Sequence, residues 1–282
     1  MFCGKRVISM IELEKQLIDK FKMHAINIEL LCKTEGELQL LQIIKSTNFW
    51  EDWVDASAHD APPPDFYSDK YKIMMDVMKV EDNTRKTKKG SLRNPKAVKE
   101  REIYNLFTRF GKFPLEKANP SVYITINEPT GLPTKEDHRF EWYYNNFTRV
   151  LNEHNKKIPL YKKNHEGYAT VFFVFDESTA YAQFPTEQDY TKYIDMQIGQ
   201  KVENTIIHFA HYDEKFQNVI KSIDADYIIW YAPYKIFCGY TENGKLANQP
   251  LPQAVIIDVK ALKQGNITCD HYVESLMVSA EG

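Results

Sequence analysis

Two acidic residues in the N-terminal third of the chain have the spacing of a metal site. Asp65 follows Pro64 directly, and Asp76 interrupts the apolar run 73–80 after a short polar gap that suits a hairpin turn. Carboxylates supply the hard oxygen ligands that Mg²⁺ prefers. A bound Mg²⁺ polarises a phosphodiester and lowers the pKa of an attacking water. We therefore interpret Asp65 and Asp76 as metal ligands and catalytic residues, with capping of a turn and pairing with a cation as the structural alternative.

This pattern resembles the PD-(D/E)xK superfamily of restriction-endonuclease-like nucleases over residues 11–80. The resemblance implies that the two acids meet at one point and hold a divalent metal. It also implies that a lysine two positions after the second acid stabilises the developing charge. An acid on the preceding helix often completes such a site, and Glu12, Glu14 and Glu29 are available for that role.

The lysine of the motif is displaced in this chain. Met78 stands two positions after Asp76, and Lys79 comes one residue later. Because successive side chains alternate across a strand, Lys79 should point to the opposite face. A bulge would restore Lys79 as the catalytic lysine. Alternatively, Lys88 or Lys89 would replace it.

A basic segment follows these acids between residues 81 and 99. A positive loop beside a metal site would grip a nucleic-acid backbone, with an affinity that falls as salt rises. The alternative is a solvated loop, since the formal charge of the chain is −3 and supplies no general attraction to nucleic acid. The predicted nucleic-acid-binding residues are Lys86, Lys88, Lys89 and Arg93.

Other acids and histidines give weaker signals. Asp258 and Lys260 lie two residues apart, so on a strand they would share a face as an alternative site or as a surface ion pair. Asp176 ends another apolar run, where open α/β sheets bind ligands or a following element is capped. His208 and His211 have the spacing of a helical metal pair or of a partly buried aromatic segment.

Composition and missing motifs argue against several classes of protein. The 282 residues are 43% hydrophobic and 27% charged, close to globular averages. The four cysteines form no CxxC pair, which argues against a zinc ribbon. No run approaches the roughly 18 apolar residues that cross a bilayer, and the N-terminus lacks the apolar segment of a signal peptide. Motifs for nucleotide loops and hydrolase elbows are also missing. We expect a cytoplasmic protein without a membrane segment.

Hydrophobic periodicity predicts alternating helices and strands. The expected helices are residues 11–32, 35–46, 100–110, 135–156 and 213–222. The expected strands are residues 71–80, 122–127, 170–175, 227–231 and 254–259. This order predicts an α/β fold with a central mixed sheet and helices on its faces. With the motif, it indicates a restriction-endonuclease-like core with helical elaborations, in a single domain over residues 1–282 whose residues 1–60 form a helical layer.

The functional expectation is a Mg²⁺-dependent nuclease or a catalytically degenerate relative of one. The alternative is a non-enzymatic regulatory or defence-related interaction protein that keeps the fold without its chemistry. The two differ in whether a lysine reaches the two carboxylates.

Overall fold

The computed structural model describes residues 5–25, 28–56, 64–81, 85–86, 92–93, 140–178, 182–183, 201–203, 206–207, 210–233, 254–267 and 275–277. Its helices are α1 (Lys5–His24), α2 (Glu35–Lys45), α4 (Phe140–Asn155), α5 (Ile158–Asn164), α7 (Glu214–Lys221) and α8 (Val259–Leu262), with short 3₁₀ helices η1 (Phe49–Glu51) and η3 (Ala210–Tyr212).

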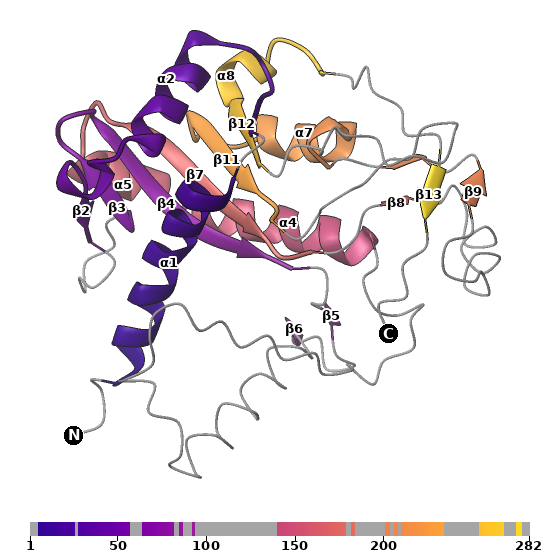
Figure 1. Cartoon of the computed structure of the whole chain (residues 1–282), viewed down its shortest axis with the longest axis horizontal. Helices are drawn as coiled ribbons and strands as arrows, with labels where there is room; N and C mark the ends of the chain where they lie inside the picture. The colour runs from indigo at the N-terminus through magenta and orange to yellow at the C-terminus, as the bar shows by residue number, and fades with distance from the viewer. Residues whose placement is uncertain are drawn as a thin grey trace.

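A mixed sheet forms the centre of the molecule (Figure 1). Its strands, in spatial order, are β1 (Ile28–Leu30), β12 (Ala254–Asp258), β11 (Tyr227–Tyr231), β7 (Ala169–Asp176), β4 (Ile73–Val80), β3 (Phe66–Ser68) and β2 (Val54–Asp55). β4, β7 and β11 run parallel, whereas β3 is antiparallel to both β2 and β4, and β12 is antiparallel to β11. Three separate ladders pair β5 (Arg85–Lys86) with β6 (Leu92–Arg93), β8 (Ala182–Gln183) with β10 (Ile206–Ile207) and β9 (Lys201–Glu203) with β13 (Ser275–Met277).

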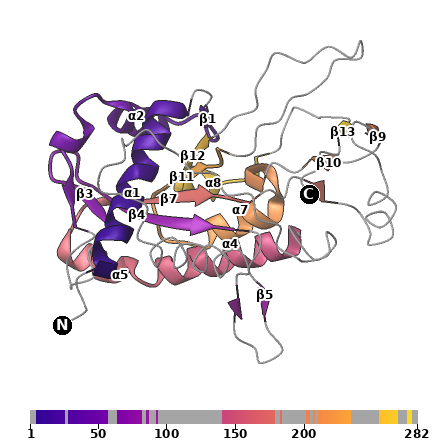
Figure 2. The ribbon, with the colours of Figure 1, turned by 60° about the horizontal axis from the view of Figure 1, so that its bottom comes forward.

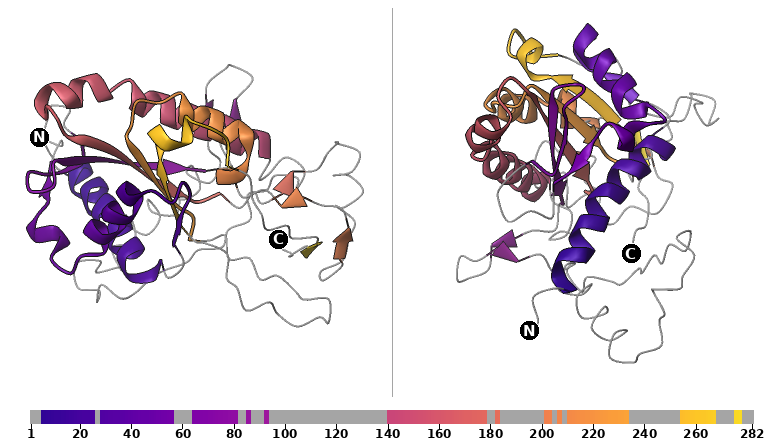
Figure 3. Two further views of the ribbon diagram at one scale, coloured as in Figure 1. Left: turned by 90° about the horizontal axis from the view of Figure 1, so that it is seen from above. Right: turned by 90° about the vertical axis from the view of Figure 1, so that its left-hand side faces the viewer.

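Helices cover both faces of this sheet, which explains why its strands are apolar without alternation. Figure 3 shows α4, α5 and α7 on one side and α1 and α2 on the other, and Figure 2 shows α4 running alongside β4. On β7, Phe172 and Val174 pack towards α4 and α7, while Phe173 and Phe175 pack towards α1. The expected α/β architecture is therefore confirmed.

Most predicted elements are present. The strands expected at 71–80, 170–175 and 227–231 are β4, β7 and β11, and the helices expected at 35–46 and 213–222 are α2 and α7. The helix expected at 135–156 is described as α4 from Phe140, and the strand expected at 254–259 ends at Asp258. The strand expected at 122–127 and the helix expected at 100–110 lie outside the described residues.

The helix expected over residues 11–32 is too long. α1 ends at His24, and Ile28–Leu30 form a strand because they pair in parallel with β12. The ammonium group of Lys45 donates to the carbonyl oxygens of Phe21, Lys22 and Ala25 at 3.2, 2.9 and 2.9 Å. Lys45 thereby satisfies acceptors that the end of a helix leaves free.

No helix within the described ranges is long and apolar enough to cross a membrane.

Phe173 tests the two-sided burial of the sheet. Its side chain is fully buried, with its ring 5.6 Å from that of Phe21. We expect Phe173→Ala to lower the free energy of unfolding by about 3–5 kcal/mol, because the truncation leaves a cavity. Leu38→Ala, at an exposed position of α2, is the control and should cost under about 1 kcal/mol. Urea denaturation measures both, and equal small losses would contradict the burial of Phe173.

Candidate active site

β3 and β4 stop pairing at Asp65, and we call this point of the sheet the fork. β3 begins at Phe66, which pairs with Met75, whereas β4 continues to Val80 beside β7. One step beyond the last β3–β4 pair, Asp65 stands opposite Asp76. The carboxylate of Asp65 accepts the backbone N–H of Val77 at 2.6 Å. The Asp65 carboxylate therefore accepts the backbone N–H of Val77, which a backbone carbonyl would have accepted if β3 continued.

The structure brings Asp65 and Asp76 together. Their carboxyl groups hydrogen-bond each other, so one of them carries a proton. Asp76 is only 2% exposed, although it stands in the middle of β4. The convergence expected from the Pro-Asp turn and the following strand is thus present in the fold.

Two side chains on the α4 side also contact Asp76. The Nδ1 atom of His154 lies 2.6 Å from Asp76 Oδ2, and the hydroxyl of Tyr161 donates to the same oxygen at 3.0 Å. His154 is in the last turn of α4, and Tyr161 is in α5. Between them, Lys157 precedes α5, and its positive charge lowers the pKa of Asp76. Asp76 is thus compensated by an imidazole, a phenol and a nearby ammonium.

α1 contributes Glu14 to this cluster. Burial raises its pKa to about 7, assisted by the negative charges of Asp76 and Asp55 and opposed by Lys157. Glu14 and the aspartate pair therefore share one electrostatic environment. Glu29, by contrast, lies in β1 at the other edge of the sheet, where it accepts from Tyr212 and lies 3.4 Å from Nε2 of His211.

The pKa values of Asp65 and Asp76 are shifted in opposite directions. Burial, the negative charge of Asp76 and that of Glu14 raise the pKa of Asp65 to about 9, although the hydrogen bond from Val77 acts against this. Burial would also raise the pKa of Asp76, but the hydrogen bond and charge of His154 hold it below its ordinary value. The opposite directions of the two shifts favour the proton on Asp65 and the negative charge on Asp76.

The donor chemistry fits a divalent cation, since carboxylates suit Mg²⁺ and an added imidazole suits Mn²⁺ or Zn²⁺. Glu14, Asp65, Asp76 and His154 are the residues that would hold it. In the part of the chain that the structure describes, however, no three His, Cys, Asp or Glu side chains are placed around one centre that could hold a metal ion. Asp76 is paired with His154 and with Asp65, so metal binding requires these side chains and that of Glu14 to turn towards a common point.

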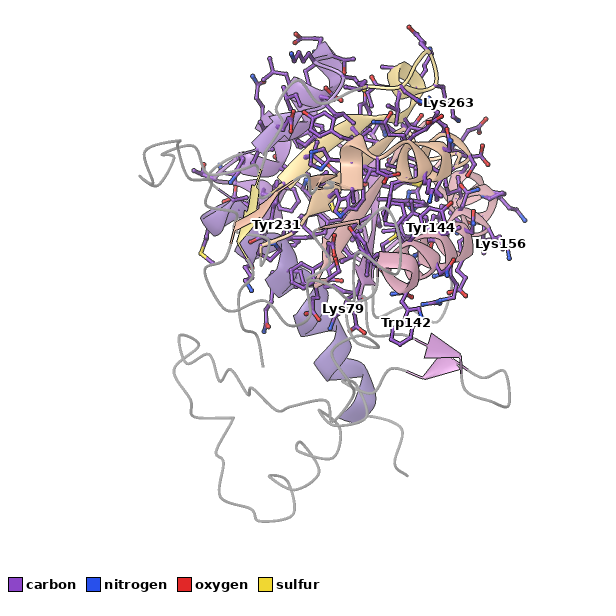
Figure 4. The ribbon with its side chains drawn as sticks, turned by 90° about the vertical axis from the view of Figure 1, so that its right-hand side faces the viewer. Lys79, Trp142, Tyr144, Lys156, Tyr231 and Lys263 are labelled. Carbon is purple, nitrogen blue, oxygen red and sulfur yellow. The ribbon has the colours of Figure 1, made fainter. Side chains whose placement is uncertain are left out.

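Lys79 does not belong to this site. Its ammonium group lies 3.0 Å from Glu81 and 2.6 Å from Glu177, at the end of β4 (Figure 4). β4 pairs with β7 in unbroken register from Ile73 to Val80, so no bulge redirects Lys79. The alternation of strand side chains is confirmed, and the catalytic role considered for Lys79 is wrong.

The basic segment is described in part. Lys86 lies in β5 and Arg93 in β6, whose backbones pair as a short antiparallel ladder. Lys88 and Lys89 lie outside the described residues. Nucleic-acid binding by the four residues stays a prediction.

The alternative site at Asp258 and Lys260 is wrong in geometry. β12 ends at Asp258, whose carboxylate caps α8 by accepting the N–H of Ala261 at 2.9 Å. Lys260 lies in α8, so the two residues do not share a strand face. Asp258 also accepts from the hydroxyl of Thr34 at 3.2 Å, which gives it a structural role.

The other predicted groups have structural partners. Asp176 is fully buried and accepts from Tyr143 at 2.6 Å and Trp230 at 2.9 Å. His211 lies in η3 and not on an α-helix, while His208 lies outside the described residues.

Sequence reasoning missed His154, Lys157 and Tyr161. Their spacing of three and four residues is helical. Pro159 obscures the signal, because a proline normally marks a helix boundary, and here it lies in the first turn of α5, four residues after the end of α4.

Comparison with known proteins adds no relative: no family model, no curated protein and no solved structure matches this chain.

Asp65→Asn tests the shared proton. A folded pKa near 9 means that the folded chain binds this proton more tightly than the unfolded chain, so the stability of the parent should fall as pH rises from about 4 to 9. Asparagine mimics the protonated acid and should remove this dependence, which amounts to about 1.4 kcal/mol per pKa unit. Melting temperatures between pH 5 and 9 measure it. The exposed Asp224→Asn is the control, and parallel pH profiles for Asp65→Asn and the parent would contradict the assignment.

Proposed function

We propose that this protein is a divalent-metal-dependent phosphodiesterase of the nuclease type, with its active site at the fork between β3 and β4. The observation that carries the proposal is the convergence of Asp65 and Asp76 within the electrostatic reach of Glu14 from α1. These three acids come from the turn, the strand and the preceding helix that the PD-(D/E)xK resemblance implies. The mixed sheet covered by helices on both faces supports a restriction-endonuclease-like core.

Each side chain at the fork has a role in this proposal. Asp65 and Asp76 would hold the metal, with Glu14 as the third carboxylate. A metal bound there would polarise a phosphodiester and lower the pKa of an attacking water. His154 is oriented by Asp76 and is placed to accept a proton. Lys157 replaces the missing lysine of the motif, because its charge reaches both Glu14 and Asp76 from the start of α5.

The second candidate is the non-enzymatic regulatory or defence-related interaction protein. One observation favours it: the carboxyl groups and the imidazole satisfy each other within the described residues and surround no common centre. In that case the cluster is a buried polar network that fixes α4 and α5 on the sheet. Metal binding separates the two candidates.

Metal binding and cleavage provide the test. A metal that binds only the folded chain stabilises it by about 2.7 kcal/mol at a hundredfold excess over Kd. We expect Mg²⁺ or Mn²⁺ to raise the melting temperature of the parent and not that of Asp76→Asn. Lys157→Met should lower metal-dependent cleavage about a hundredfold, while Lys215→Met, at an exposed position of α7, should not. A parent that neither binds metal nor cleaves would favour the interaction protein.

The basic segment makes a separate prediction. If Lys86, Lys88, Lys89 and Arg93 contact phosphates, changing all four to Ser should flatten the salt dependence of duplex binding by about 0.9 units of slope per lost contact. Sequence preference should not change, because phosphate contacts carry no base information. Titrations at several salt concentrations measure the slope, and a quadruple variant with the parental slope would assign these residues to a solvated loop.

A further inference from the structure

We propose that α5 and the adjoining turn of β3 and β4 form a binding surface for single-stranded nucleic acid, which leads the strand to the fork at Asp65 and Asp76. The inference rests on the proposed function of that fork and names its substrate class. It assigns backbone binding to a surface other than the basic segment at residues 85–93.

The segment that contains α5 is rich in positive charge. Residues 154–165, HNKKIPLYKKNH, include four lysines and two histidines and no acid. Lys156, Lys157, Lys162 and Lys163 are all exposed. Within the described part of the chain, none of these four lysines forms a salt bridge, whereas Arg149 and Lys70 are paired with Glu153 and Asp52. A chain with a net charge of −3 thus places four lysines that form no salt bridge among the described residues in and just before α5.

The packing of α5 places this charge beside the fork. Ile158 and Tyr161 are buried, and the hydroxyl of Tyr161 donates to Asp76 at 3.0 Å. One side of α5 therefore contacts the candidate active site while its lysines face solvent. A phosphate backbone held by these lysines lies next to the carboxylates, and the charge of Lys157 already reaches Asp76.

Three aromatic rings contact one another at the C-terminal end of α5. The ring of Tyr67 lies 4.4 Å from that of His165, which lies 5.1 Å from Tyr168, and all three side chains are partly exposed. Tyr67 lies in β3 and Asp65 directly precedes that strand, so on an extended backbone the two side chains point to one side about 7 Å apart. A platform of rings therefore adjoins the fork on the same face as the acid pair.

These two features together favour a single strand over a duplex. Lysines that follow a backbone and aromatic rings on which bases stack are the elements of sequence-independent single-strand binding. The faces of bases in a duplex are already stacked on their neighbours, so a ring platform gains nothing from them. Stacking on Tyr67 and His165 requires an unpaired base.

The test uses a fluorescein-labelled dT20 and the full chain in EDTA, so that cleavage does not interfere. Anisotropy titrations from 50 to 300 mM NaCl give the affinity and its salt slope. The double variant Lys162→Gln with Lys163→Gln should bind at least tenfold more weakly at low salt and lose about 1.4 units of slope, at about 0.7 per contact. The matched control is Lys215→Gln with Lys260→Gln, which removes two exposed lysines from α7 and α8 and should bind as the parent does.

Tyr67 tests the stacking. Tyr67→Leu should weaken dT20 binding about tenfold, whereas Tyr67→Phe keeps the ring and should bind as the parent does. A dT20·dA20 duplex should bind the parent more weakly than dT20 at the same salt concentration.

Three results would overturn the inference: no dT20 binding by the parent at 50 mM NaCl, equal losses in the two double-lysine variants, or a duplex bound as well as dT20 with no effect of Tyr67→Leu. If metal binding and cleavage persist alongside any of these, only the surface assignment fails. If dT20 binds through Lys162 and Lys163 but no metal binds, the proposed phosphodiesterase fails and the binding surface stands.

Discussion

A buried carboxylate in the middle of the sheet constrains the structure around it. Asp76 occupies a strand that is covered by helices on both faces, and it is only 2% exposed. An isolated charge there would cost several kcal/mol, so the surrounding chain must supply donors. It does so with His154, Tyr161 and the protonated carboxyl of Asp65. The break between α4 and α5 follows from this need, because it brings residues of both helices to one oxygen.

The same constraint explains the position of the fork. If β3 continued past Phe66, its backbone would occupy the space in which the Asp65 side chain accepts from Val77. Ending the ladder at this point leaves the edge of β4 available to side chains from several elements. Two apolar cores, one on each side of the sheet, hold these elements in place. The site is therefore assembled from pieces distant in sequence, while its stability comes from apolar packing that takes no part in the chemistry.

The sequence predicts the parts of this arrangement that depend on local pattern. β4, β7 and β11 are recognisable because burial on both faces requires continuous apolar runs, and Asp65 and Asp76 are recognisable from the turn between their strands. The end of α1 was missed because Ile28–Leu30 become a strand only through pairing with β12, more than two hundred residues away. The prediction that Asp258 and Lys260 share a strand face was wrong because Asp258, at the end of β12, caps α8, and Lys260 lies in that helix. The contribution of His154 and Lys157 is tertiary, and no spacing rule links them to residue 76.

The two buried aspartates of the sheet, Asp76 and Asp176, have different partners. Asp176, at the end of β7, accepts hydrogen bonds from a phenol, an indole and the backbone N–H of Ser178, which are neutral donors fixed by packing. Asp76 contacts the imidazole of His154 and the phenol of Tyr161, and its charge acts on the carboxyl group of Asp65. A cation can replace a proton held between carboxylates, because both compensate the same negative charge. Asp176 thus joins β7 to α4 and β11, whereas Asp76 joins β4 to the end of α4 and to α5.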